Sequence, residues 1–202
     1  MIKASYEILQ PGSRQSFLAR KFDQLAFDSP YHFHPEYELT CIIQGEGKRY
    51  MGSHMEDFFS DDLVLIGPNL PHCWKLDPAT DQMAASAIVI QFNESFLGKD
   101  FFERPELKEI KKLFKRAASG VSFGGNIQSE VNKNLALLDA EESNFNKMLI
   151  LLDILQQLAL SNEYALLDQS QSMGERSLAE QERINPVFAY LVENFRRQVS
   201  PT

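Results

Sequence analysis

The fold is decided by residues 32–74, which read HFHPEYELTCIIQGEGKRYMGSHMEDFFSDDLVLIGPNLPHCW. Short apolar runs in this stretch alternate with polar residues and end at clusters of Gly, Asp, Asn and Pro, which are turn-forming residues. Alternation with a period of two is typical of brief antiparallel strands. Working outward, the same pattern predicts strands over 16–22, 37–43, 47–52, 62–66 and 85–92. Strands at this spacing predict a β sandwich or barrel.

After residue 93 the apolar period lengthens. Apolar residues recur at helical spacing behind Pro105 and predict a helix over 105–118. The stretch VSFGGN, residues 121–126, predicts a glycine loop, and further helices are expected over 126–138 and 143–162. The 143–162 helix carries two apolar stripes, so one face is expected to cover the β lobe. Its other face either meets a second copy of the chain or is buried within its own chain.

A polar stretch without periodicity, DQSQSMGERSLAEQER, covers residues 168–183 and predicts an exposed linker. Beyond the linker, apolar residues at helical spacing predict one more amphipathic helix within 184–202. The apolar stripe of this helix has no core of its own. It is expected either to pack back on the preceding lobe or to begin a further domain.

Composition excludes several classes of function. The 202 residues include 20 Lys and Arg against 28 Asp and Glu, a formal net charge of -8, which disfavours a surface built to neutralise nucleic-acid phosphates. Two cysteines make no disulfide framework, the N-terminus lacks a signal-peptide pattern, and the most apolar run, 148–160, is too short to span a membrane. The cytoplasm is the expected location. The sequence contains no G-x-S-x-G elbow, P-loop or G-x-G-x-x-G motif.

The histidines give the main chemical clue. His32, His34 and Glu38 project to one face if the chain is extended, and His72 from another strand would complete a set of four metal ligands. Mixed imidazole and carboxylate ligands suit Zn, Ni, Mn or Fe, and the sequence does not separate these ions. The alternative is a polar pocket that hydrogen-bonds an organic ligand or is satisfied within itself.

Other polar or aromatic side chains are candidates for the same pocket. Trp74 lies two residues after His72 and shares its side of a regular strand, so it is either an aromatic plate for a sugar or planar ligand or a core residue. Gln91 stands in an apolar strand and is either a pocket residue or a hydrogen-bonded core amide. Arg20 and Arg49 could bind an acidic ligand, although arginines on solvated strand faces are commoner.

The spacing of the first histidine segment resembles the first motif of the cupin superfamily, whose small β barrels hold a central metal. The matching positions are His32, His34, Glu38 and Gly45. Asp62, Pro68 and His72 follow the order of the second cupin motif. Residues 69–71 and Leu76 depart from its usual pattern, as Ala26 does ahead of the first motif. These departures argue against an enzymatic cupin.

The wider stretch 32–74 is similar to the N-terminal cupin-like sensor domain of AraC-type bacterial transcription regulators. The resemblance implies a mainly β fold, a double-stranded β-helix (jelly-roll) barrel over 1–100, followed by an α-helical dimerisation segment over 101–167. It implies that 168–183 is the linker and that 184–202 is the first helix of a helix-turn-helix DNA-binding domain whose remainder is missing from this sequence.

The resemblance implies a homodimer that is not an enzyme and that binds a small-molecule effector, with a carbohydrate favoured. DNA would be contacted only through the missing C-terminal domain. The expected ligand-binding residues are His32, His34, Glu38, His72, Trp74, Gln91 and Arg20. A divalent metal ion held by the first four is the one cofactor considered. The alternative function is a metal-dependent cupin enzyme, an oxygenase or isomerase, that uses the same four ligands.

Overall fold

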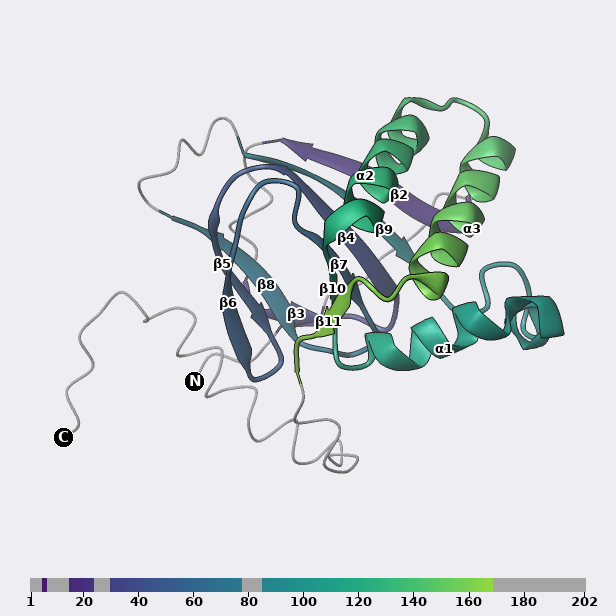
Figure 1. Ribbon diagram of the computed structural model, residues 1–202, viewed down its shortest axis with the longest axis horizontal. Helices are drawn as coiled ribbons and strands as arrows, with labels where there is room; N and C mark the ends of the chain where they lie inside the picture. The colour runs from purple at the N-terminus through teal and green to yellow at the C-terminus, as the bar shows by residue number, and fades with distance from the viewer. Residues whose placement is uncertain (1–4, 7–14, 24–29, 78–84, 169–202) are drawn as a thin grey trace.

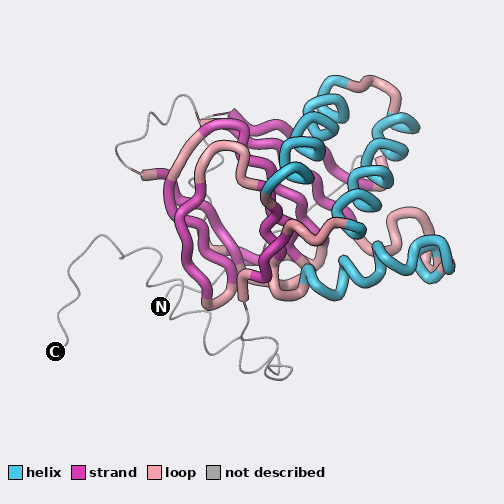
Figure 2. The backbone as a smooth tube through the Cα atoms, viewed as in Figure 1, coloured by secondary structure: helices cyan, strands magenta, loops and turns pink. Residues whose placement is uncertain are grey.

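A computed structural model of the chain describes residues 5–6, 15–23, 30–77 and 85–168. Within these residues the chain forms two facing β-sheets and a group of helices that lies on one side of them (Figures 1 and 2). The five-stranded sheet has the order β1-β3-β8-β5-β6, and the six-stranded sheet has the order β11-β10-β7-β4-β9-β2. All strand pairs are antiparallel except β1 with β3. The predicted mainly β jelly-roll barrel with following helices is confirmed.

The five strands that alternation of apolar and polar residues predicted are all present, and the described residues contain further short strands that it did not predict. The strands are β1 (Ser5–Tyr6), β2 (Phe17–Asp23), β3 (His32–Phe33), β4 (Tyr37–Gln44), β5 (Gly47–Met51), β6 (His54–Phe58), β7 (Leu63–Ile66), β8 (His72–Leu76), β9 (Ser86–Phe92), β10 (Val121–Phe123) and β11 (Tyr164–Leu166). The turns between them use the residues that the sequence suggested, and Asp61 and Asn69 adopt positive φ angles of 70° and 60°. Asp and Asn tolerate this left-handed conformation better than most residues.

The helices also follow the sequence pattern. They are η2 (Phe101–Glu103), η3 (Pro105–Leu107), α1 (Lys108–Ala117), α2 (Gly125–Ala140) and α3 (Asn144–Leu160). Pro105 begins the 3-10 turn that leads into α1, because its fixed φ suits a first helical position. Ser143 caps α3 by accepting a hydrogen bond from the backbone N–H of Asn146. Among the residues that the structure describes, no helix has both the length and the apolar character to cross a lipid bilayer.

The glycine loop expected over 121–126 is wrong in its first half. Residues Val121–Phe123 form β10, which pairs with β7 on one side and with β11 on the other. The segment that the sequence assigned to dimerisation therefore adds two strands to the barrel's larger sheet. Residue 168 is the only residue of the expected linker among those described, and the helix expected within 184–202 lies outside the described residues.

The central strands β4 and β7 of the six-stranded sheet are buried on both faces over most of their length. Alternate residues of β4 and β9, such as Leu39 and Ile90, pack against α1, α2 and α3 in one apolar cluster. The intervening residues, such as Ile42 and Ala87, face the barrel interior and join a second cluster with Trp74 of the other sheet. The barrel interior is therefore enclosed between two sheets, with the helices stacked outside one of them (Figure 2).

Candidate functional site

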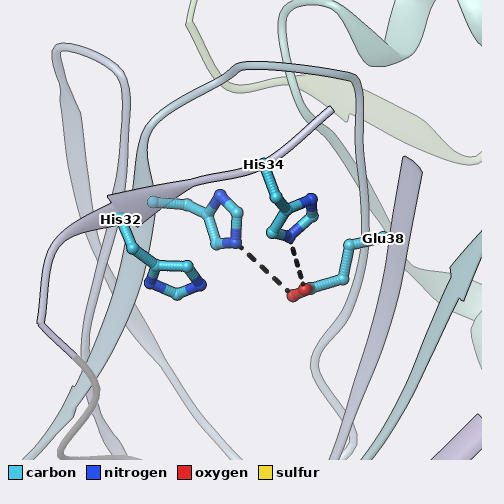
Figure 3. A group of neighbouring side chains, drawn as sticks. His32, His34 and Glu38 are labelled. Atoms are coloured by element: carbon cyan, nitrogen blue, oxygen red, sulfur yellow. Dashed lines mark hydrogen bonds and ion pairs between the residues drawn. The ribbon is translucent and has the colours of Figure 1, made fainter. Parts of the chain in front are cut away.

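Three imidazoles and one carboxylate gather in the barrel. His32 lies in β3, His34 follows it in the loop before β4, Glu38 lies in β4 and His72 begins β8. One nitrogen or oxygen of each side chain lies within 4.8 Å of the others, and Figure 3 shows the rings of His32 and His34 beside the Glu38 carboxylate. We call these four residues the quartet. Three of them are buried, and His32 is half-buried, so the quartet reaches the surface on the His32 side.

Strand pairing brings the quartet together. His32 of β3 lies opposite His72 of β8 across the five-stranded sheet, and the centroids of their rings are 4.4 Å apart. Glu38 lies on the barrel-facing side of β4, where alternate residues point away from the helices. The structure thus joins the four residues that the sequence selected by same-face spacing and by the order of the two motifs.

Backbone carbonyls orient all three imidazoles. The Nδ1 atoms of His32, His34 and His72 lie 2.8, 3.2 and 2.7 Å from the carbonyl oxygens of Pro30, Glu36 and Leu70. A carbonyl only accepts hydrogen bonds, so each Nδ1 carries the hydrogen and each neutral ring has its acceptor at Nε2. Metal-ligating histidines are commonly held in this way through the ring nitrogen that does not bind the ion.

Glu38 is the centre of a buried hydrogen-bond network. It accepts hydrogen bonds from the Gln91 side-chain amide at 2.7 Å and from the Thr40 hydroxyl at 2.8 Å. Burial alone would raise the pKa of Glu38, but the neighbouring His72 and the hydrogen-bonded His34 hold it well below its usual range. Glu38 therefore carries a negative charge inside the barrel.

The quartet fits a divalent cation. Nε2 of His34 lies 3.0 Å from Oε2 of Glu38, and two acceptors at this distance require a shared proton or a cation. Nε2 of His72 is 3.7 Å from Oε1 of Glu38 and makes no hydrogen bond to any residue that the structure describes. Zinc binds nitrogen and oxygen ligands at about 2.0–2.2 Å, so donors gathered within 4.8 Å are close to the separation that one ion needs.

Protonation in the quartet is compatible with metal binding at neutral pH. Burial, followed by the neighbouring His72 ring, lowers the pKa of His32 to about 4. The ring is therefore neutral at pH 7, which is the form that ligates metals. An ion at the quartet would also place a positive charge beside the buried Glu38 carboxylate, which needs such a partner.

The other candidate residues surround the quartet to different degrees. Gln91 contacts Glu38 directly, and Arg20 donates a hydrogen bond of 2.9 Å to the Gln91 side-chain oxygen. Trp74 is buried with its ring in edge contact with His72, at a centroid distance of 5.9 Å. The indole nitrogen of Trp74 finds no hydrogen-bond partner among the described residues. All seven candidates thus belong to one region of the barrel.

Two features of this region were not predicted. Thr40 supports Glu38, and its position two residues further along the same strand was the available signal. Arg49 is only 2% exposed and forms ion pairs with Glu56 and Asp62, so the expectation of a solvated arginine is wrong. Its partners come from a neighbouring strand and from the turn before β7, and alternation along β5 alone could not identify them.

Comparison with known proteins gives structural likeness only. No family model matches the sequence, and no curated protein matches it either. The AraC-like transcriptional activator CuxR is similar over 92% of this chain and 60% of its own, with 8% identity and a TM-score of 0.42. The ToxT protein of Vibrio cholerae with bound unsaturated fatty acid is similar over 95% of this chain and 68% of its own, with 12% identity and a TM-score of 0.47.

The chain resembles AraC-like regulators in structure. It also resembles a cupin 2 conserved barrel domain protein from Rhodopseudomonas palustris over 42% of this chain and 57% of that one, with 19% identity and a TM-score of 0.32. The chain spans less than two thirds of the length of CuxR and of this cupin. At these identities and TM-scores the likeness says nothing about ligand or activity, which depend on the side chains of the site.

Proposed function

We propose that this chain is the effector-sensing and dimerising part of a cytoplasmic AraC-type transcription regulator. One observation carries the proposal: a hydrogen-bonded carboxylate and three oriented imidazoles lie buried together inside the barrel. Burying polar groups costs free energy that apolar packing would not cost. Such a cluster is retained when it binds something, and binding inside a folded barrel can alter how the attached helices hold a DNA-binding domain.

The first occupant we propose is a divalent first-row cation, Zn, Ni, Mn or Fe. His32, His34 and His72 would ligate it through Nε2, and Glu38 through a carboxylate oxygen. When bound, the ion supplies a positive charge and a coordination position for an oxygen of an organic effector. The Nδ1 contacts to backbone carbonyls keep the three rings aimed at the ion position.

The organic effector we propose is polyhydroxylated, as a carbohydrate is. Trp74 lies beside the quartet with its ring in T-shaped contact with His72, and apolar sugar faces stack on tryptophan rings. Gln91 and Arg20 add an amide and a guanidinium next to it. Sugar hydroxyls both donate and accept hydrogen bonds, so they can pair with either group.

The outer side of α3 supports a homodimer. Leu151, Ile154 and Leu158 are buried against the barrel, while Phe145 and Leu149 remain 63% and 47% exposed. Complete burial within its own chain, one of the two alternatives for this helix, is therefore not observed in the described structure. Exposed apolar residues on one helix side mark association surfaces, and a second copy offers the same stripe in a two-fold arrangement.

Metal content and thermal stability test the proposed site. Elemental analysis of the purified, untagged chain is expected to show one ion per chain, and melting with a chelator is expected to lower the midpoint, because an ion that binds only the folded state stabilises it. His72→Ala should lose both the ion and the chelator effect. His54→Ala is the matched control, since His54 lies outside the quartet on β6. A chain without metal whose melting ignores chelator would refute the metal site.

The second candidate is a metal-dependent cupin enzyme. The complete donor set of the quartet favours it, because mixed imidazole and carboxylate ligands serve oxygenases as well as sensors. The exposed apolar side of α3 favours the regulator, since a catalytic barrel does not need it. Turnover of a bound organic ligand by the metal-loaded protein would support the enzyme, and recovery of that ligand unchanged would support the sensor.

A further inference from the structure

A buried carboxylate fastens the end of the described chain to the barrel. Asp168 directly precedes residues 169–202 and is only 3% exposed. Its carboxylate accepts a hydrogen bond of 3.0 Å from the Ser53 hydroxyl and one of 3.3 Å from the Ser53 backbone N–H. Its own backbone N–H donates to the carbonyl of Ser119 at 2.8 Å. Asp168 therefore joins the turn between β5 and β6 to the turn that follows α1.

The β5–β6 turn is shaped to receive this carboxylate. Gly52 has a φ angle of +54°, a conformation that favours glycine. A Cβ atom on Gly52 would lie 2.1 Å from Oδ2 of Asp168, so no larger residue fits beside the carboxylate. The contact between this glycine turn and a buried carboxylate therefore depends on a close fit, unlike most ion pairs, which lie on the surface and contribute little to stability.

A short path connects this contact to the quartet. The buried Tyr31 precedes His32 in the chain and donates its hydroxyl hydrogen to the Gly52 carbonyl at 2.7 Å. On the other side of the turn, Met51 lies opposite His72 across β5 and β8.

We propose that Asp168, Ser53 and Gly52 form a latch that holds the chain entering residues 169–202 against the barrel, and that a divalent cation in the quartet tightens this latch through Tyr31. The coupling rests on the proposed function, because it takes the quartet as the ligand site. The latch itself rests only on the contacts of Asp168.

The direction of the coupling follows from how β3 is held. β3 has two residues, pairs with the two residues of β1 on one side, and meets β8 on the other side through the single pair His32 and His72. An ion that ligates both rings fixes β3 and therefore Tyr31, whose hydroxyl then holds the Gly52 carbonyl in place for Asp168. Ion binding already accounts for the conformational entropy lost when β3 is ordered, so the contact of Asp168 with the β5–β6 turn then forms with a smaller entropy loss. Linkage requires the reverse effect as well: a latched chain must bind the ion more tightly than an unlatched one.

Hydrogen exchange on the full chain tests the latch without any ligand. In Asp168→Ala the amides of Ser53 and Leu167 are expected to exchange about tenfold faster, because hydrogen bonds to a charged group are among the stronger ones in proteins. Asp139→Ala, which removes an exposed carboxylate from α2, is the matched control and should leave these amides unchanged. Equal exchange in Asp168→Ala and the parent chain would overturn the latch.

Zinc alone then tests the coupling. Zn²⁺ is expected to slow exchange of the Ser53 and Leu167 amides in the parent chain, and Asp168→Ala should bind Zn²⁺ more weakly by the same factor. Tyr31→Phe removes only the hydroxyl and should bind Zn²⁺ while losing the protection of Ser53. Zinc binding that leaves both amides unchanged in the parent chain would overturn the coupling and leave the metal site intact. Absence of zinc binding would overturn the metal site and the coupling, while the Asp168→Ala result would still decide the latch.

Discussion

The two faces of β4 are both buried, yet they hold different chemistry. On the helix side, Tyr37, Leu39 and Cys41 join an apolar cluster with side chains of α1, α2 and α3. On the barrel side, Glu38 and Thr40 form a hydrogen-bonded network with the histidines and Gln91. The two sets alternate along one strand, so the local backbone is the same for both. The side chains that contact each face therefore distinguish a packing surface from a binding surface.

This difference indicates that the barrel side of β4 serves a function in addition to folding. Apolar burial stabilises by about 25 cal/mol per Å², and each side chain on the helix side contributes in this way. A buried carboxylate surrounded by imidazole acceptors stabilises nothing comparable until a proton or cation compensates its charge. We therefore expect substitutions on the helix side to affect folding and substitutions on the barrel side to affect ligand binding.

The largest expected effect is on the helix side. Leu39→Ala removes a fully buried side chain between β4 and the helices and should lower the free energy of unfolding by about 2–5 kcal/mol, through lost burial and the cavity that remains. Denaturant titration in the presence of chelator measures this change. Leu137→Ala, at a largely exposed leucine of α2, is the control and should change stability by less than about 0.5 kcal/mol.

The folded fraction of Leu39→Ala should still bind zinc with the affinity of the parent chain, because Leu39 points away from the quartet. If zinc affinity fell along with stability, the two faces would not act independently and the comparison would fail.

The next effect, on the barrel side, should depend on metal. Glu38→Gln keeps the size of the side chain. With its amide oxygen in the place of Oε2 it still accepts from Gln91, and its amide nitrogen in the place of Oε1 can donate to the Thr40 hydroxyl, so the metal-free stability should change by less than about 1.5 kcal/mol. The parent chain should gain about 2.7 kcal/mol at a zinc concentration of 100 times its Kd, and Glu38→Gln should lose most of this gain. Thermal melts across a zinc series measure both quantities. A full zinc-dependent gain in Glu38→Gln would remove the carboxylate from the ligand set.

The sequence predicted the strands that carry the site because their alternation is regular. β4 and β9 lie within a residue or two of their expected bounds, and same-face spacing placed His32, Glu38 and Trp74 on the correct side of the barrel. The sequence could not predict β10, since three strand residues before two glycines resemble a loop and their partners β7 and β11 are remote in the chain.

Long-range polar partners were also beyond the sequence. Arg49 is neutralised by carboxylates from other segments, and the latch joins Ser53 to Asp168 across 115 residues. Alternation reports which side of a strand is buried, but it carries no information on which distant polar group will satisfy a buried one. The quartet was an exception because its members follow a motif with a fixed spacing.

The smallest effect on folding is expected on a third apolar surface, the outer side of α3. Phe145→Gln should change the free energy of unfolding of the monomer by less than about 0.5 kcal/mol, because this ring is already largely exposed. The same substitution should shift the chain from dimer to monomer in sedimentation velocity at micromolar concentration, since an association surface loses its exposed aromatic residue. Met55→Gln, at an exposed apolar residue of β6, is the matched control and should leave the sedimentation coefficient unchanged. If Phe145→Gln sediments as the parent chain does, the outer side of α3 is not the dimer interface. Its exposed apolar residues would then contribute neither to folding nor to association.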